Sequence, residues 1–283
     1  MKKIIMLSVV VLFMLVGVAH AGNVVKFAGG PSGLSYEKTP KAVKPVVDAA
    51  GLGFTLEVIT TQGGGENVQL VKTGKADFGI APSKMVSQAG LPVVGVLFDT
   101  YAHLVCSKKL IKGATSIKDL VNLAESQKAP IQVAVGGPNS AARWIWDSLA
   151  SLDDNYGTNN FDPVHVSFKS VIGMVNAGQV ACAWTVSGVG SSAMKAADYP
   201  GADKVLQIMD VDDSDFNDDD YIFAEVDSAN YPNIAKGWGS DIDTFKVPVV
   251  LFTRPGFKQS NPMGYMMISG EAKRQATILF KQK

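Results

Sequence analysis

The sequence predicts an α/β protein made of two similar lobes, and three observations support this prediction. Strand-like and helix-like segments alternate along the chain. Residues 67–83 and 171–187 align without gaps at an offset of 104, and each copy runs through an apolar helical face, a glycine, a strand and a polar turn. Glycine-rich segments around Gly29 and Gly136 precede the two copies in the same order. A duplicated architecture explains all three observations.

The first lobe is expected to begin with a strand at 24–27. A helix follows, with an apolar face at Val43, Val46, Val47 and Ala50, although Pro45 leaves its starting point open. The helix of the first repeat copy should end at Gly74, because a residue without Cβ adopts the left-handed backbone of a helix C-terminus at little cost. Further strands are expected at 55–59, 76–80 and 93–97.

The second lobe is expected to contain a helix that begins at Ser116, where Ser116 and Asp119 resemble a capping box. A strand at 131–135 comes next, and then a helix whose apolar face contains Ala142, Ile145, Leu149 and Leu152. Gly178 should end the following helix as Gly74 does in the first copy, before a strand at 180–185. This alternation favours mostly parallel sheets, in which binding loops lie at the carboxyl ends of the strands.

Composition excludes several classes of protein. The chain has 283 residues, 26 Lys+Arg against 26 Asp+Glu, and 47% hydrophobic residues, so it is too apolar for disorder and has no net charge to attract nucleic acid. His103 and His165 lie in strand-like runs away from any nucleophile motif, and the spacing of Cys and His does not fit a metal site. We therefore expect no nucleic-acid partner, no metal, no cofactor and no catalytic residues.

Residues 1–21 have the pattern of a signal peptide. Lys2 and Lys3 precede an apolar run from Ile4 to Val18, and Ala19-His20-Ala21 forms an A-x-A cleavage site. The run is shorter than the ~20 residues that a transmembrane helix needs. We expect cleavage before Gly22 and export of the mature chain to the periplasm.

The two cysteines, Cys106 and Cys182, could pair in an oxidising compartment. Each lies inside an apolar, strand-like run, which is typical of buried thiols. We expect free thiols at both positions.

The glycine-rich loops of the two lobes should face a shared cleft. Backbone N–H groups in such loops, together with the helix N-termini behind them, favour an anion such as a carboxylate. The first lobe supplies the candidate ligand-binding residues Gly30, Ser32, Gly33, Tyr36, Gln62, Gly63, Gly64, Asn67 and Ser83. The second lobe supplies Gly137, Asn139, Ser140, Arg143, Trp184 and Ser187.

Three of these candidates have specific expected roles. Arg143 lies in the second turn after Pro138, so its guanidinium could reach back to the cleft and hold a carboxylate with two hydrogen bonds; the alternative is a solvated surface arginine. Tyr36 and Trp184 could stack on the ligand, or they could belong to the core or the rim.

Several segments resemble the TAXI-type solute-binding proteins of TRAP transporters, which have the type II periplasmic binding protein fold. The similarity is strongest at Gly30-Pro-Ser-Gly-Leu-Ser-Tyr36, Thr61-Gln-Gly-Gly-Gly-Glu-Asn67, Gly74-Lys-Ala-Asp77 and Val133-Ala-Val-Gly136. The resemblance implies two α/β lobes joined by crossing hinge strands, with a glutamate-like amino acid or small carboxylate bound between them and delivered to membrane permease subunits. Residues 138–141 and the short segment after Phe257 depart from the family pattern.

On this resemblance we expect residues 22–105 and 206–283 to form lobe 1 and residues 106–205 to form lobe 2. The hinges are expected near His103–Lys108 and Val205–Asp210, and the protein is expected to be a monomer.

Two other functions are compatible with parts of the sequence. A sensory receptor subunit would need the same export signal and cleft. Gly188 to Ala193 fits G-x-G-x-x-A after a strand, and Asp210 follows at the spacing of a dinucleotide fingerprint, which keeps a dinucleotide-dependent enzyme as a minor alternative. The acidic run 210–220 begins like a calcium loop but lacks its turn glycine and bidentate glutamate, so we expect a solvated loop there. The alternatives are a low-affinity cation site and a docking surface for the membrane partner.

Overall fold

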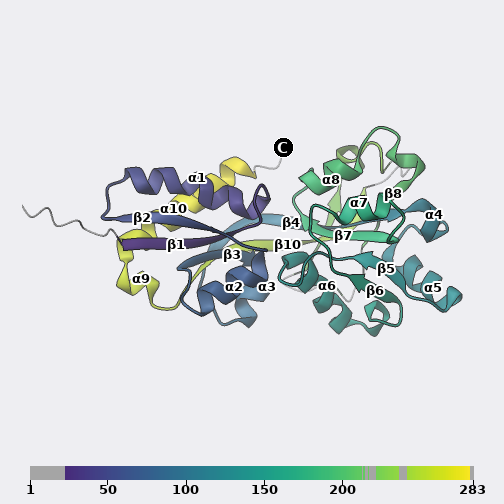
Figure 1. Ribbon diagram of the computed structural model, residues 1–283, viewed down its shortest axis with the longest axis horizontal. Coiled ribbons are helices and arrows are strands. Elements are labelled where there is room, and N and C mark those ends of the chain that lie inside the picture. Colours follow the sequence, from purple (N-terminus) through teal and green to yellow (C-terminus); the bar gives the residue numbers. More distant parts are fainter. Residues whose placement is uncertain (1–22, 212, 214–215, 217–220, 236–240, 281–283) are drawn as a thin grey trace, which may run out of the picture.

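The computed structural model describes residues 23–211, 213, 216, 221–235 and 241–280. Both the predicted signal peptide, 1–21, and most of the acidic run 210–220 lie outside these residues. Figure 1 shows two α/β bodies side by side, connected by the long strands β4 (Val93–Ser107) and β10 (Ile242–Thr253). The predicted architecture of two lobes and crossing strands is confirmed.

The first lobe is built on three parallel strands in the order β2-β1-β3. Its elements are β1 (Asn23–Gly30), α1 (Ser35–Ala49), β2 (Phe54–Thr60), α2 (Gly64–Lys72), β3 (Phe78–Pro82), α3 (Ser83–Gln88), α9 (Phe257–Ser260) and α10 (Pro262–Leu279). Helix α1 begins at Ser35 and continues through Pro45, which settles the starting point that the sequence left open. Gly74 has a φ of 71° just after α2, as predicted. The C-terminal helix α10 packs beside α1 on this lobe (Figure 1).

The second lobe contains the parallel strands β7-β5-β6. Its elements are α4 (Lys108–Ile111), α5 (Ile117–Gln127), β5 (Ile131–Ala134), α6 (Ala141–Leu152), β6 (Phe161–Val164), α7 (Val171–Asn176), β7 (Cys182–Ser187), α8 (Ser192–Ala197), β8 (Leu206–Met209) and β9 (Ile222–Val226), with 3-10 turns at Asp154–Tyr156, Ala202–Lys204 and Ser228–Asn230. The capping box at Ser116 and the left-handed Gly178, with a φ of 68°, are both present.

One sheet runs through both lobes, because β4 and β10 change partners along their length. Strand β10 pairs with β3 through Val249–Thr253 and with β9 through Ile242–Lys246. Strand β4 pairs with β10 up to Tyr101, and from Tyr101 onward it pairs with β7. All pairings of these two strands are antiparallel, whereas the outer strands of each lobe are parallel.

This pairing changes the expected boundaries of the lobes. Strand β8 pairs with Leu104–Ser107, and β9 pairs with the second-lobe half of β10, so the described residues between 206 and 247 pack with the second lobe and not with the first. The connection between the lobes lies near Tyr101 in β4 and near Val247 in β10. It therefore lies earlier than the predicted hinge at His103–Lys108, and the second connecting strand is β10 instead of the segment Val205–Asp210.

The expectation of free thiols is wrong, because Cys106 and Cys182 form a disulfide. The two residues lie directly opposite each other on the antiparallel strands β4 and β7, with Cα atoms 4.0 Å apart. Both are fully buried, as expected, but the register of the two strands brings their sulfur atoms together.

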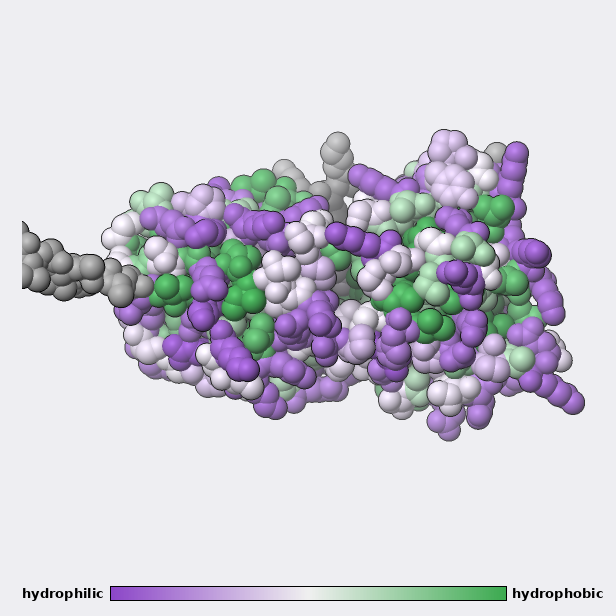
Figure 2. All heavy atoms as spheres, viewed as in Figure 1, coloured by the Kyte–Doolittle hydropathy of each residue, from purple (hydrophilic) through white to green (hydrophobic). Residues whose placement is uncertain are grey.

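Each lobe has its own apolar core. In the first lobe Phe27, Phe78 and Phe257 pack between the sheet and α9–α10, and in the second lobe Trp146, Trp184 and Phe245 form an aromatic cluster. Hydrophilic and apolar side chains are interspersed over both lobes on the face shown in Figure 2. Among the described residues, no helix combines the length and the hydropathy needed to cross a bilayer.

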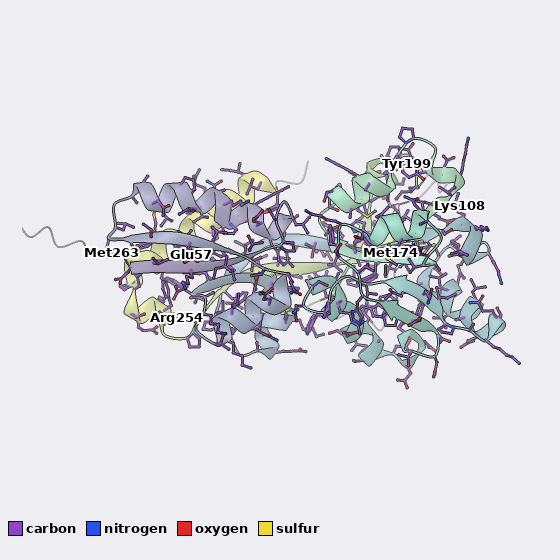
Figure 3. All side chains as sticks on the ribbon, in the orientation of Figure 1. Glu57, Lys108, Met174, Tyr199, Arg254 and Met263 are labelled. Atoms are coloured by element: carbon purple, nitrogen blue, oxygen red, sulfur yellow. A yellow bond between two sulfur atoms is a disulfide. The ribbon has the colours of Figure 1, made fainter. Side chains whose placement is uncertain are left out.

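Asp77 and Arg254 form an ion pair at the end of the first lobe that lies away from the second lobe. Arg254, labelled in Figure 3, donates from Nε to Asp77 Oδ1 over 2.6 Å. The other carboxylate oxygen of Asp77 accepts the backbone N–H of Lys26, which fixes the segment before β3 against β1. These contacts lie away from the loops that face the second lobe, so they hold the scaffold and do not form part of the site.

Candidate functional site

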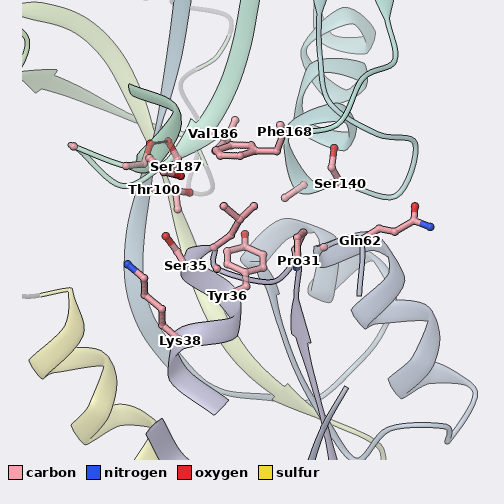
Figure 4. A pocket seen from close by; sticks show the side chains of 18 of the residues that line it. Pro31, Ser35, Tyr36, Lys38, Gln62, Thr100, Ser140, Phe168, Val186 and Ser187 are labelled. Carbon is pink, nitrogen blue, oxygen red and sulfur yellow. Dashed lines mark hydrogen bonds between the residues drawn. The ribbon is translucent and has the colours of Figure 1, made fainter. Parts of the chain in front are cut away.

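A cavity of about 270 Å³ lies between the lobes and is lined by both of them. The first lobe contributes the loop before α1, the start of α1 and the loop before α2, and the second contributes the starts of α6 and α8 and the end of β7 (Figure 4). The lining residues are Pro31, Gly33, Leu34, Ser35, Tyr36, Lys38, Gln62, Gly63, Thr100, Ser140, Ala141, Ala142, Phe168, Val186, Ser187, Gly190, Ser191, Ser192 and Lys195.

The N-terminus of α1 faces the cavity without a side-chain cap. Its N-cap residue is Leu34, which has no side-chain acceptor. The backbone N–H groups of Ser35 and Tyr36, the first two helical residues, have no acceptor among the described residues. Since α1 has fifteen residues, its dipole adds partial positive charge at this end. The two amides are therefore available to a ligand.

Glu37 holds the loop that precedes α1. Its buried carboxylate accepts the N–H of Gly33 over 2.7 Å and pairs with Lys41 Nζ at 2.9 Å. Burial alone would raise the pKa of Glu37, but the hydrogen bonds from Gly33 and Lys41 outweigh it and hold the pKa below its usual value. Glu37 therefore stays ionised and fixes the wall formed by Pro31 to Leu34.

The N-terminus of α6 faces the same cavity from the second lobe. Ser140 is the N-cap, and its hydroxyl accepts the N–H of Arg143 over 3.1 Å. The N–H groups of Ala141 and Ala142 have no acceptor among the described residues, and both residues line the cavity. The amides at the start of two long helices thus meet a single space from opposite lobes.

The charge of the lining is entirely positive. Lys38 and Lys195 line the cavity, and neither has an ion-pair partner among the described residues. No Asp or Glu is among the residues that line it. In addition, the described part of the chain contains no group of three or more His, Cys, Asp or Glu placed to hold a metal ion. The cavity therefore suits an anion held by N–H and ammonium donors.

The loop between β7 and α8 is tied to the buried end of β4. The N–H of Gly190 donates to the Tyr231 hydroxyl over 3.4 Å, and the same hydroxyl lies 2.8 Å from Nε2 of His103. Burial lowers the pKa of His103 to about 4, against a smaller opposing effect of the Tyr101 backbone. The imidazole is therefore neutral at neutral pH.

The neutral state of His103 predicts a loss of stability in mild acid. The unfolded chain binds a proton near pH 6.5, whereas the folded chain does not until about pH 4, so stability is full above pH 6.5 and is lost as the pH falls toward 4. We expect the free energy of unfolding to be about 2 kcal/mol lower at pH 5 than at pH 7.5 from this residue. Urea denaturation at both pH values measures the difference.

His103→Gln is the control for this prediction, because an amide preserves a hydrogen-bonding group near Tyr231 and does not titrate. The pH dependence of the variant should be smaller than that of the wild type by about 2 kcal/mol. Identical pH dependence in the two proteins would contradict a neutral buried imidazole.

Six residues of the sequence-predicted set line the cavity: Gly33, Tyr36, Gln62, Gly63, Ser140 and Ser187. Five others lie in the same loops or at a helix start but outside the lining, namely Gly30, Ser32, Gly64, Gly137 and Asn139. Gly30 is required where it stands, since its φ is 145° and a Cβ there would come within 2.7 Å of Tyr36 Cβ.

The remaining four predicted residues have other surroundings. Asn67 and Trp184 are fully buried, and the Trp184 indole donates to the carbonyl of Ala142. Ser83 begins α3 outside the lining. Arg143 does not line the cavity either; its Nε pairs with Asp147 Oδ2 at 2.7 Å and its Nη1 lies 3.0 Å from Nε2 of His165.

Sequence reasoning missed several cavity residues. Lys38 and Lys195 lie one turn inside α1 and α8, where an exposed lysine has no distinguishing pattern in a single sequence. Thr100 faces the cavity because β4 crosses between the lobes there. The predicted hinge, His103–Lys108, lies further along the chain. Phe168 and Ser191 lie in the loops before α7 and α8, and neither was among the predicted residues.

The two lobes touch beside the cavity, between the start of α2 and the start of α6. The N–H of Gly65 donates to the carbonyl of Asn139 over 3.1 Å, and the Asn139 amide donates to Gln62 Oε1 over 3.2 Å. A Cβ on Gly65 would lie 2.9 Å from that carbonyl oxygen, so glycine permits this approach. Trp144 of α6 packs against the cores of both lobes.

A family model matches most of the chain. Residues 47–268 match the model of the NMT1-like family. No curated protein sequence shows significant similarity to the chain.

Solved structures with the same fold bind different small molecules. An amino acid ABC transporter substrate-binding protein, AbpA, from Streptococcus pneumoniae, bound to L-arginine, has 15% identity over 92% of this chain and 90% of its own, with a TM-score of 0.51. Lactococcal OpuAC, closed on glycine betaine, has 13% identity over 92% and 95%, with a TM-score of 0.52. PhnD1 from Prochlorococcus marinus, with methylphosphonate, has 13% identity over 93% and 87%, with a TM-score of 0.54. The fold is thus that of type II periplasmic binding proteins.

Proposed function

We propose, from the premise that this chain belongs to the NMT1-like family, that it is a solute-binding protein that captures a small organic anion between its lobes and delivers it to a membrane transporter. The observation that carries the proposal is the cavity between the lobes, where the free N–H groups of α1 and α6 meet from opposite sides. The sequence-derived candidates, a small carboxylate or a glutamate-like amino acid, both present an anion to these groups.

Binding in such a cavity would stabilise a state in which the lobes are close together. The ligand contacts both lobes, so its contacts exist in full only when the lobes approach each other. Movement would be concentrated in β4 and β10, which are the strands that pass between the lobes near Tyr101 and Val247. Closure would then present a composite surface to permease subunits.

Export to the periplasm and a permease partner complete the proposal. The N-terminal signal-peptide pattern and the disulfide support an oxidising compartment outside the cytoplasm. The TAXI-like segments support a TRAP-type permease, whereas the structurally similar AbpA is described as part of an ABC transporter. Reconstituted transport with each class of permease would distinguish the two.

A thermal-shift screen of organic acids and amino acids, followed by calorimetry, tests the proposed function. A true ligand should bind with a stoichiometry of one and raise the melting temperature with concentration. Ser140→Pro alters the start of α6 and should weaken the binding of that ligand. Leu152→Ala, at the exposed far end of α6, should leave the binding unchanged. If no small solute binds, the proposed function is wrong.

Trp144→Ala is expected to weaken ligand binding by about tenfold without removing a cavity-lining residue. Trp144 contacts the apolar core of each lobe, so its loss disfavours the state in which the lobes touch. Calorimetry with the ligand found in the screen measures the affinity, and Leu152→Ala is the matched control on the same helix. An affinity equal to that of the wild type would exclude Trp144 from closure.

A further inference from the structure

The polar groups around the cavity define the class of anion more narrowly than the fold does. Two lysines and the amides at the starts of α1 and α6 are donors only, and the lining contains no carboxylate. The other polar side chains of the lining are neutral hydroxyl groups and the Gln62 amide. An α-amino acid carries an ammonium group on the carbon next to its carboxylate. If that carboxylate were held by the helix N-termini, the ammonium would lie among like charges without an anionic partner, which is unfavourable in a partly desolvated site.

A neighbouring crevice of about 760 Å³ has carboxylates in its lining. This crevice shares Ser35, Lys38, Gly190 and Ser191 with the cavity, and its lining includes Asp99, Glu225 and Asp227. Asp99 is already paired with Lys246 Nζ at 3.2 Å, and the Asp227 carboxylate accepts the N–H of Ala229. These acids line the adjoining crevice and are not among the residues that line the cavity.

Part of the cavity wall is apolar. Pro31, Leu34 and Tyr36 contribute from the first lobe, and Phe168 and Val186 contribute from the second; Figure 4 shows the Tyr36 ring below Phe168 and Val186. The cavity is slightly smaller than the ~300 Å³ lower limit of typical drug-sized sites. Its occupant should thus have one compact apolar body and one anionic end.

We infer that the cavity takes a small organic acid with an apolar body and no ammonium group on the carbon next to its carboxylate. This inference rests on the proposed function and specifies its ligand. The carboxylate would accept N–H groups of Ser35, Tyr36, Ala141 and Ala142, and the ammonium groups of Lys38 and Lys195 would neutralise it.

Matched pairs of compounds test the inference directly. Calorimetry on the mature protein would compare L-leucine with 4-methyl-2-oxopentanoate and L-phenylalanine with phenylpyruvate, because each pair differs only in the group on the α-carbon. We expect at least one 2-oxo acid to bind about a hundredfold more tightly than its amino acid. Binding of any amino acid as tightly as its 2-oxo partner would overturn the inference and leave the proposed function intact.

Absence of binding by every pair would also overturn the inference. A further screen of neutral and cationic solutes then tests solute binding separately. A hit there would keep a solute-binding function but exclude an anion as its ligand, and a complete lack of hits would remove the solute-binding function.

Lysine variants test the role of the two charges. Lys38→Gln and Lys195→Gln should each lower the affinity for the best-binding 2-oxo acid by about tenfold. Lys75 is exposed and lies outside the cavity, so Lys75→Gln should leave this affinity unchanged. Melting temperatures of the unliganded variants separate a loss of binding from a loss of folding. Unchanged affinity in both cavity variants would contradict the proposed neutralisation of the anion.

Discussion

Replacing both Cys106 and Cys182 by alanine is expected to lower the free energy of unfolding by about 4 kcal/mol. The disulfide closes a loop with a sequence separation of 76 residues, and a cross-link of this span restricts the unfolded chain strongly. Both sulfur atoms are buried in the second lobe between β4 and β7, so little of the effect should depend on solvent conditions. Urea denaturation of the oxidised wild type and of the double variant measures the loss.

Reduction supplies the control for the disulfide. The reduced wild-type protein should lose nearly the same stability as the double variant, whereas reductant should not change the variant. Equal stability of the variant and the oxidised wild type would show that the two cysteines are not cross-linked or that the cross-link does not constrain the unfolded chain.

Asn67→Leu is expected to destabilise the first lobe by about 3–5 kcal/mol. The Asn67 amide donates to the carbonyls of Gly29 and Ile80 over 3.2 and 2.8 Å, and its carbonyl accepts the Thr61 hydroxyl over 2.6 Å. Because the side chain is fully buried, a leucine would leave these three groups without their partner. Chemical denaturation measures the change.

Gln69→Leu is the matched control, since Gln69 lies on the same helix, is exposed and makes no side-chain hydrogen bond among the described residues. That substitution should change stability by less than about 0.5 kcal/mol. If Asn67→Leu were equally mild, the hydrogen bonds of Asn67 would not hold the ends of β1, β2 and β3 together.

Local signals predicted much of the scaffold. Gly74 and Gly178 were recognised as helix ends because a left-handed backbone needs glycine, and Ser116 was recognised as a helix start because a capping box has a fixed spacing. The repeat located the loops around Gly33 and Ser140, which do line the cavity. These features depend on residues close together in the sequence, and a single sequence is sufficient to show them.

Features that depend on distant pairing could not be predicted in the same way. The disulfide depends on the register of β4 against β7, and the assignment of β8, β9 and the first half of β10 to the second lobe depends on which strands they join. Periodicity in the sequence does not specify either choice.

The surroundings of Arg143 were open to a better prediction. Asp147 lies four residues further along the same helix, so an ion pair between them was readable as an i, i+4 contact. That local partner competes with any role of the guanidinium in the cleft.

A crystal structure of the protein with the tightest-binding solute from the screen tests the central claim most directly. We expect electron density for the solute in the cavity. Its anionic group should lie within hydrogen-bond distance of a backbone N–H group in α1, from Ser35 or Tyr36, and of one in α6, from Ala141 or Ala142. A solute bound to one lobe alone, or in the neighbouring crevice beside Glu225 and Asp227, would contradict it.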